Sequence, residues 1–304
     1  MVCFENVAGF PVAGEAQSAR ARNTDFVSEP FGENEDEDVN YEAAVDAYVA
    51  HLAEHPDDAG IWFDIGIAYK HLRRWQQCVN ANLRALELNP NEPGDPAWWN
   101  LGIAATALRD WPLARKAWRG YGLSIDGEEG PVTCAYGMTP VRLPNGEVVW
   151  GDSIDPARVI IRNVPFRDSG FRWGDIVLRD GAPNGERRSG TQTYSVFNVL
   201  EKWSPSEIPT YAVTVTCGDA SDSEALVKLF EEQSFAAEDW TANVRTLCAA
   251  CSRGNPDAQH THAFKADATE REFGIAAPRG LAEKLLARWA SGARGRSYGA
   301  LEAS

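Results

Sequence analysis

Two cysteines and two histidines within fifteen positions form the strongest chemical signal in this chain of 304 residues. They follow the pattern Cys248-x2-Cys251-x8-His260-x-His262. Residues three apart on a helix share a face, and alternate residues of an extended segment point the same way. Two thiolates and two imidazoles suit tetrahedral zinc, so the pattern predicts a Zn2+ site. Four protein ligands would make that site structural rather than catalytic.

The same four residues allow other interpretations. The loop of eight residues is shorter than that of a usual zinc finger, and a half-buried thiol pair beside two exposed loop histidines would explain the spacing equally simply. A catalytic zinc would need water in place of one ligand and a nearby base, for which Asp257 or Asp267 would serve. The sequence identifies no catalytic residue, and we expect a protein that is not an enzyme.

Other chemically suggestive residues have structural explanations. The tripeptide Trp-Gly-Asp occurs at residues 150–152 and 173–175, which suggests paired carboxylates. A turn-forming Gly-Asp beside a packing tryptophan explains it as well. Arg187 and Arg188 suggest an anion site or an exposed turn. The sequence contains neither a glycine-rich phosphate loop nor a G-x-S-x-G motif.

Charge narrows the classes of partner. The chain has 29 Lys and Arg against 44 Asp and Glu, a net charge of −15, which disfavours nucleic acid and anionic membranes as partners. Its apolar stretches fall short of the 18 or so residues of a membrane span, and its start lacks the features of a secretory signal. We therefore expect a cytoplasmic protein that binds a protein or peptide, most plausibly a basic one.

The composition of residues 1–38 predicts a disordered acidic tail. They hold nine acidic and two basic residues and no apolar periodicity. Such a segment buries too little apolar surface to offset the entropy lost on ordering.

Residues 39–125 repeat a helical pattern with a period of about 34 to 36. Small residues recur where two helices would meet closely, and large aromatic residues recur beside them. The upstream residues Tyr41, Ala44, Tyr48 and Pro56 match only the second half of a unit. The next two units are marked by Trp62, Ile65, Gly66, Tyr69, Cys78, Ala85 and Pro90, and then by Trp98, Leu101, Gly102, Trp111, Ala114 and Trp118. This resembles the tetratricopeptide repeat (TPR), a helix-turn-helix unit that opens with W-x2-L-G-x2-Y.

The resemblance implies an array that binds peptides on a concave face formed by the first helix of each unit. The partner-binding residues on that face would be Phe63, Ile67, Lys70, Trp99 and Ile103. They are mostly apolar, which makes recognition of a C-terminal carboxylate doubtful. Either they hold an apolar partner segment, or the C-terminal half of this chain covers them.

The sequence pattern of residues 131–291 predicts a mixed α+β domain. Residues 292–304 are predicted to form a frayed tail. Turns are expected at residues 143–146 and 181–185, both rich in Gly, Pro and Asn. Helices are expected at Ser223–Gln233, Glu238–Cys251 and Leu281–Ala290. The expected strands are Glu147–Trp150, Arg158–Val164, Asp175–Arg179, Tyr194–Leu200, Thr210–Cys217 and Arg271–Ala276, the earlier ones in a partly open sheet or barrel.

These patterns favour a TPR-type interaction adaptor with a structural zinc site. Toxin neutralisation or assembly of a complex would suit such a protein, by analogy of fold and charge alone. The alternative is a zinc-dependent hydrolase or transferase that uses the array to recruit its substrate.

Overall fold

A computed structural model describes residues 39–90, 94–241 and 269–303. Five helices are followed by a mixed domain with two sheets and further helices, which confirms the expected fold class. Of the described residues, a first compact unit holds those up to Cys134 together with Asp180–Pro183, and a second unit holds the rest. The predicted acidic tail lies outside the described residues.

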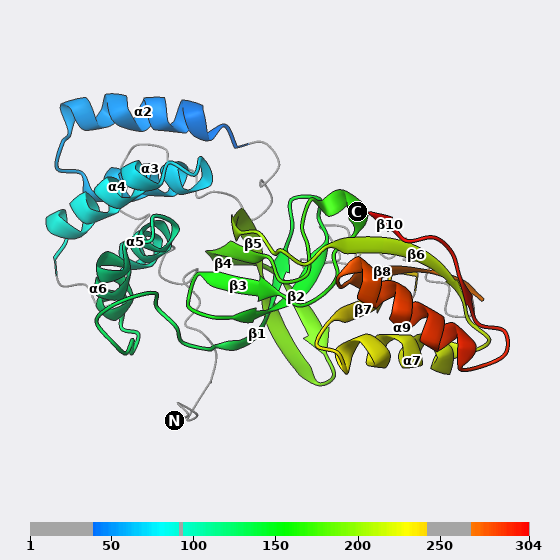
Figure 1. Cartoon of the computed structure of the whole chain (residues 1–304). Coiled ribbons are helices and arrows are strands. Elements are labelled where there is room, and N and C mark those ends of the chain that lie inside the picture. The colour runs from blue at the N-terminus through cyan, green and yellow to red at the C-terminus, as the bar shows by residue number, and fades with distance from the viewer. Residues whose placement is uncertain (1–38, 91–93, 242–268, 304) are drawn as a thin grey trace. The chain divides into compact units, whose positions relative to one another are not determined.

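The first unit is an array of helices that follow one another as hairpins (Figure 1). Aspartates begin three of them: the side chains of Asp58, Asp95 and Asp110 each accept a hydrogen bond from a backbone N–H of the first turn. The helices are α2 (Tyr41–Glu54), α3 (Ala59–His71), α4 (Trp75–Leu88), α5 (Pro96–Ala107) and α6 (Trp111–Tyr121).

The turns of the hairpins α3–α4 and α5–α6 are the same structure shifted by 36 residues. Each contains one non-glycine residue with positive φ, Arg73 at 56° and Arg109 at 61°. Three backbone hydrogen bonds also recur: Leu72 to Ala68, Arg73 to Lys70 and Arg74 to Tyr69 in the first turn, and Leu108 to Ala104, Arg109 to Thr106 and Asp110 to Ala105 in the second.

Helix α2 corresponds to α4, 34 residues later. Both helices have 14 residues, and their C-caps share a conformation, with φ and ψ of −127° and 69° at His55 and −126° and 66° at Asn89. The unit therefore contains two full hairpins preceded by the second helix of another.

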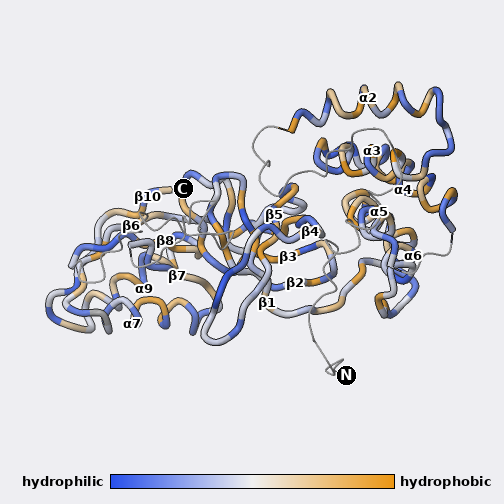
Figure 2. Tube along the Cα trace, turned by 180° about the vertical axis from the view of Figure 1, so that it is seen from behind, coloured by the Kyte–Doolittle hydropathy of each residue, from blue (hydrophilic) through white to orange (hydrophobic). Residues whose placement is uncertain are grey.

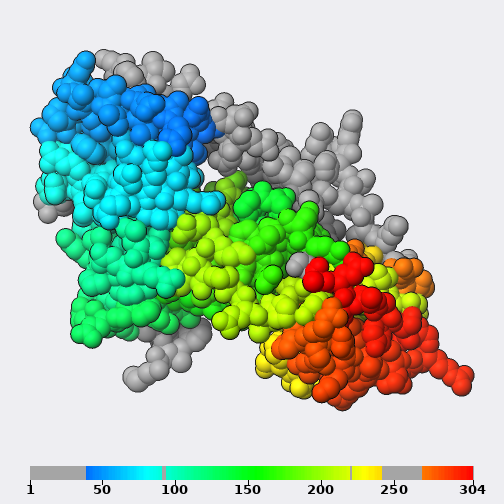
Figure 3. All heavy atoms as spheres, turned by 45° about the horizontal axis from the view of Figure 1, so that its top comes forward, coloured from blue at the N-terminus to red at the C-terminus, as the bar shows by residue number. Residues whose placement is uncertain are grey.

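Small residues bring the paired helices together at equivalent places. A Cβ added to Gly66 would lie 2.6 Å from Nδ2 of Asn82, and one added to Gly102 would lie 2.6 Å from the ring of Trp118. Asn82 and Trp118 are again 36 residues apart. Figure 2 shows apolar residues alternating with polar ones along these helices, and Figure 3 shows the helices packed in chain order.

Trp62 and Trp98 occupy equivalent places in the two hairpins. Trp62 packs with a cluster that includes Val45 of α2, and Trp98 packs with one that includes Val79 of α4. Each indole also packs within its own hairpin: Trp62 shares a cluster with Ala85 of α4, and a Cβ added to Gly120 of α6 would lie 2.6 Å from the Trp98 ring. The two tryptophans therefore pack both with the preceding helix and with the second helix of their own hairpin.

The second unit begins with a closed barrel of five strands. Its strands are antiparallel except where β1 and β5 close the barrel in parallel, with Val141 opposite Phe197. Branched side chains such as Val149, Val159 and Val177 fill the interior. The strands are β1 (Gly137–Arg142), β2 (Val148–Ser153), β3 (Arg158–Ile161), β4 (Ile176–Ser189) and β5 (Gln192–Ser204).

A second sheet follows, with two helices packed on one face (Figure 1). Its strand order is β10-β6-β8-β7, with β9 also pairing with β6. The core between sheet and helices includes Val213, Phe230, Phe273 and Leu286. The elements are β6 (Thr210–Thr216), α7 (Ala220–Glu231), β7 (Ala236–Asp239), β8 (Glu270–Ala276), α9 (Arg279–Ser291), β9 (Ser297–Tyr298) and β10 (Glu302–Ala303).

The turn predicted at residues 181–185 is wrong, because these residues lie inside strand β4. Glycine inside a strand often marks a close approach of another group or a bend. Gly181 lies against the ring of Trp99, and Gly185 has a φ of 98°. Tertiary contact therefore overrides the local preference for a turn.

Two other expectations differ from the structure. The helix predicted from Glu238 does not begin there, because Ala236–Asp239 form β7 and pair with β8; most of the remaining range lies outside the described residues. The tail expected from residue 292 contains β9 and β10, which both pair with β6. Strand β1 was not predicted at all.

Candidate functional site

The inner face of the helical array collects four of the five predicted partner-binding residues in buried positions. Phe63 and Lys70 on α3 and Trp99 and Ile103 on α5 are buried, whereas Ile67 is half-buried. Burial of a lysine is unusual because its ammonium group loses its hydration. Lys70 is only 4% exposed, so its surroundings must supply acceptors.

Those acceptors come from α5 and from the segment Asp180–Pro183. The Nζ of Lys70 donates to Oδ1 of Asp180 at 2.6 Å and to Oδ1 of Asn100 at 3.2 Å. Nε2 of His71 lies 3.7 Å from the other carboxylate oxygen of Asp180. We call Lys70, His71, Asn100 and Asp180 the charge cluster; His71 is half-buried and the other three are buried.

Asp180 is held as a carboxylate. Burial by itself would raise its pKa, but the positive charges of Lys70 and His71 and the hydrogen bonds from Lys70 and the Gly181 N–H outweigh burial and lower the pKa. The carboxyl group of Asp180 therefore stays ionised at a lower pH than an ordinary aspartate does. The ring of Tyr41 on α2 stacks on His71 at a centroid distance of 4.5 Å, so helix α2 also contacts the cluster.

An aromatic wall lies next to the charge cluster. The ring of Trp99 is packed edge-on against Trp118 at 5.2 Å and against Tyr121 at 4.9 Å. Gly181 lies on this wall so closely that a Cβ there would overlap the Trp99 ring. The inner face thus holds an extended segment by one ion pair and one glycine-on-indole contact.

Two of the other predicted residues, Phe63 and Ile103, are buried. Phe63 packs between α4 and α5, in a cluster with Ala85 and Ala97. Ile103 is fully buried. Of the predicted residues, Lys70 bonds to Asp180, and Trp99 lies against Gly181.

Sequence reasoning missed Asn100, His71 and Asp180. Asn100 carries a weak signal, because it is an amide within an otherwise apolar helix. Asp180 carries none, because it lies 110 residues from Lys70 in a stretch whose composition indicates a turn.

The four predicted zinc ligands, Cys248, Cys251, His260 and His262, lie outside the described residues. Within the described ranges, no group of three or more His, Cys, Asp and Glu residues is placed to hold a metal ion. The zinc prediction therefore stays a prediction. Cys78 is a core residue: burial raises the pKa of its thiol to about 12, although Lys70 and the hydrogen bond from Asn82 oppose the rise.

The acidic residues of the repeated Trp-Gly-Asp tripeptide do different things. Asp152 forms an exposed ion pair with Arg162 at 2.7 Å. Asp175 is buried and accepts hydrogen bonds from the backbone N–H groups of Arg172 and Ser206. The tripeptides therefore form no shared site. The predicted turn is present at Trp173-Gly174, but it is wrong for residues 150–152, which lie inside strand β2.

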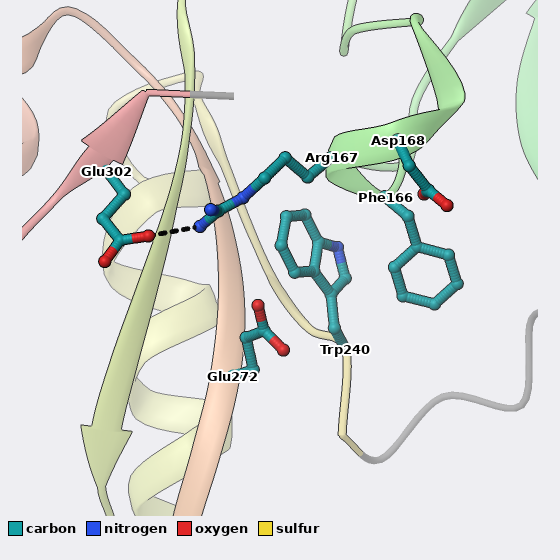
Figure 4. A pocket seen from close by; sticks show the side chains of 6 residues that line it. All are labelled: Phe166, Arg167, Asp168, Trp240, Glu272 and Glu302. Atoms are coloured by element: carbon teal, nitrogen blue, oxygen red, sulfur yellow. Dashed lines mark hydrogen bonds and ion pairs between the residues drawn. The ribbon is translucent and has the colours of Figure 1, made fainter.

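A surface hollow of about 730 Å³ lies in the second unit (Figure 4). Phe166 and Trp240 line it with rings 5.7 Å apart, and the indole N–H of Trp240 donates to the carbonyl oxygen of Val164. Its rim carries Asp168, Glu272 and an ion pair between Arg167 and Glu302 at 2.8 Å.

Excess negative charge at this rim would favour a cationic group. All four charged side chains are exposed, however, and solvent weakens exposed charge interactions. The inner face of the array has buried charges and a shape constraint, and it is the better candidate site.

No known family model matches the chain, and neither does any curated protein. Within the described part of the chain, no helix has both the length and the apolar character that a bilayer crossing requires.

Proposed function

We propose that this protein is a docking adaptor built on a TPR-type array, and that the inner face of α3 and α5 is its docking surface. The observation that carries the proposal is the way this face holds residues Asp180–Pro183. An extended segment lies on the first helices of two hairpins, fastened by a buried ion pair and by contact with Trp99. Peptide recognition by a stacked helical array uses the same elements.

The TPR assignment rests on the repeated hairpin. Turns of the same conformation, equivalent Gly66 and Gly102, and equivalent Trp62 and Trp98 agree with the sequence pattern. The assignment predicts that an array of two and a half units presents a concave face lined by α3 and α5.

Affinity capture tests the docking function. Full-length protein and a Lys70→Met/Trp99→Ala variant would serve as baits in matched extracts, and captured proteins would be compared quantitatively. An Arg84→Ala variant is the control, because the ion pairs of Arg84 with Asp57 and Glu87 are exposed. Loss of partners from the double variant alone supports the proposal, and equal recovery from all three baits would contradict it.

The proposal includes a structural zinc ion bound by Cys248, Cys251, His260 and His262. Metal analysis of the purified protein should find one zinc per chain. Cys251→Ser should remove the metal and lower the melting temperature, because the binding energy of structural zinc adds to folding. Full zinc content in the variant would rule out this ligand set.

A further inference from the structure

Building on the docking function proposed above, we propose that the inner face recognises an extended Asp-Gly segment of a partner protein. Residues Asp180–Pro183 of this chain occupy the face in cis. The chemistry of the face restricts both positions of the dipeptide.

The first position must carry an acidic side chain. Lys70 is buried, and Asn100 supplies a neutral acceptor that leaves its positive charge uncompensated. A segment without a carboxylate would bury that charge unpaired, which is strongly unfavourable. Asp180 supplies this carboxylate, and its Oδ1 lies 2.6 Å from the ammonium group of Lys70. Basic and neutral segments are thereby disfavoured.

The second position must be glycine. Any Cβ there would overlap the ring of Trp99. The ring has little freedom to move aside, because Trp118 and Tyr121 pack against it and are themselves buried. Among the residues that can follow the aspartate, glycine alone places its backbone this close to the indole.

A segment in cis competes with a partner. A tethered ligand acts at an effective concentration on the order of millimolar, so a free peptide of the same sequence binds the unaltered protein weakly. Gly181→Val should unseat the cis segment, because valine suits a strand but clashes with Trp99. The variant then exposes the face to a peptide supplied in trans.

Fluorescence anisotropy with a labelled nine-residue peptide, the sequence of residues 177–185, tests this. We expect the full-length Gly181→Val protein to bind the peptide at least tenfold more tightly than the unaltered protein does. Adding Lys70→Met to the variant should abolish the gain. A peptide in which valine replaces the glycine, and another in which asparagine replaces the aspartate, are the matched controls.

Asp180→Ala provides a second way to empty the face should Gly181→Val fail to fold, which circular dichroism would reveal. A third measurement uses the unaltered protein alone, at millimolar concentrations of peptide. Under these conditions the Asp-Gly peptide should bind measurably better than both control peptides. Equal binding of all three peptides, or a gain that survives Lys70→Met, would overturn the inference.

These outcomes are separable from those of the docking function. Partners captured through Lys70 and Trp99, combined with no preference for Asp-Gly peptides, would leave the docking function standing and remove this ligand. Preference for Asp-Gly peptides without any captured partner would remove the docking function and leave a face that serves only the chain's own segment.

Discussion

The hairpins α3–α4 and α5–α6 share a backbone but differ in what they hold. Shifted by 36 residues, Lys70 corresponds to Thr106, Phe63 to Trp99 and Asn82 to Trp118. The first hairpin therefore contributes a charge to the inner face, and the second contributes an aromatic wall. The same hairpin backbone thus carries a charged contact in one copy and an aromatic contact in the other. Both hairpins are needed to make the two contacts with the segment Asp180–Pro183.

The largest expected difference between the hairpins concerns Asn82 and Trp118. Both are fully buried opposite an equivalent glycine. Trp118→Ala should lower the free energy of unfolding by about 3 to 5 kcal/mol, because it leaves a large cavity. Asn82→Ala should cost about 1 kcal/mol, for the loss of its hydrogen bond to the Cys78 carbonyl. Urea unfolding measures both losses. Equal losses would contradict the prediction, because they would mean that the two side chains contribute equally to stability.

The second comparison sets Lys70 against Thr106. Lys70→Met leaves the carboxylate of Asp180 buried without its main partner and should cost about 3 kcal/mol. The loss falls at the lower end of the range for buried pairs because the Gly181 N–H still donates to Asp180. Thr106→Val removes no charge and should therefore lower the free energy of unfolding by much less. A Lys70→Met/Asp180→Asn protein should recover part of the loss in the same unfolding assay, and failure to recover would argue against coupling.

Lowering the pH should weaken the contribution of Asp180 to stability. The folded pKa of Asp180 is lowered, because Lys70 and His71 outweigh the effect of burial. Its contribution to stability is therefore complete above the ordinary carboxyl pKa of about 4 and is lost as the pH falls through the lowered folded value. Unfolding of the unaltered and Asp180→Asn proteins between pH 7 and pH 3 should show a gap that closes only below about pH 4. A constant gap would contradict the ionised pair.

The smallest effects should be equal in the two hairpins. Arg73 and Arg109 both have positive φ, a conformation that glycine adopts at little cost. Arg73→Gly and Arg109→Gly should each raise the melting temperature slightly, with a gain of about 0.5 kcal/mol after the added freedom of the unfolded chain is deducted. Effects of opposite sign would show that the two turns are not equivalent.

Local patterns predicted the helices well and the site only in part. Apolar periodicity, Gly66, Gly102 and the tryptophans indicate the hairpins because each unit buries its face against a neighbour in sequence. Lys70 and Trp99 were identified from their repeat positions. Asp180 was not, because the local signal of Asp-Gly indicates a turn and its partner lies 110 residues away.

The same reason explains the errors in the second unit. A helix was predicted to begin at Glu238, yet Glu238 accepts hydrogen bonds from Asn163 and Val164, and Asp239 pairs with Arg271 at 2.6 Å. Such contacts between distant segments decide the local conformation. A pattern read along the chain contains no record of them.

The separation of 110 residues between Lys70 and Asp180 also has a consequence in time. Hairpins closed by neighbours in sequence form early during folding, whereas a contact across so long a loop must wait for the intervening chain to become ordered. We therefore expect the inner face to be vacant early in folding, before strand β4 has formed. We expect a partner present at that stage to meet no internal competitor, so the order of synthesis and encounter, as well as affinity, would decide which segment is bound.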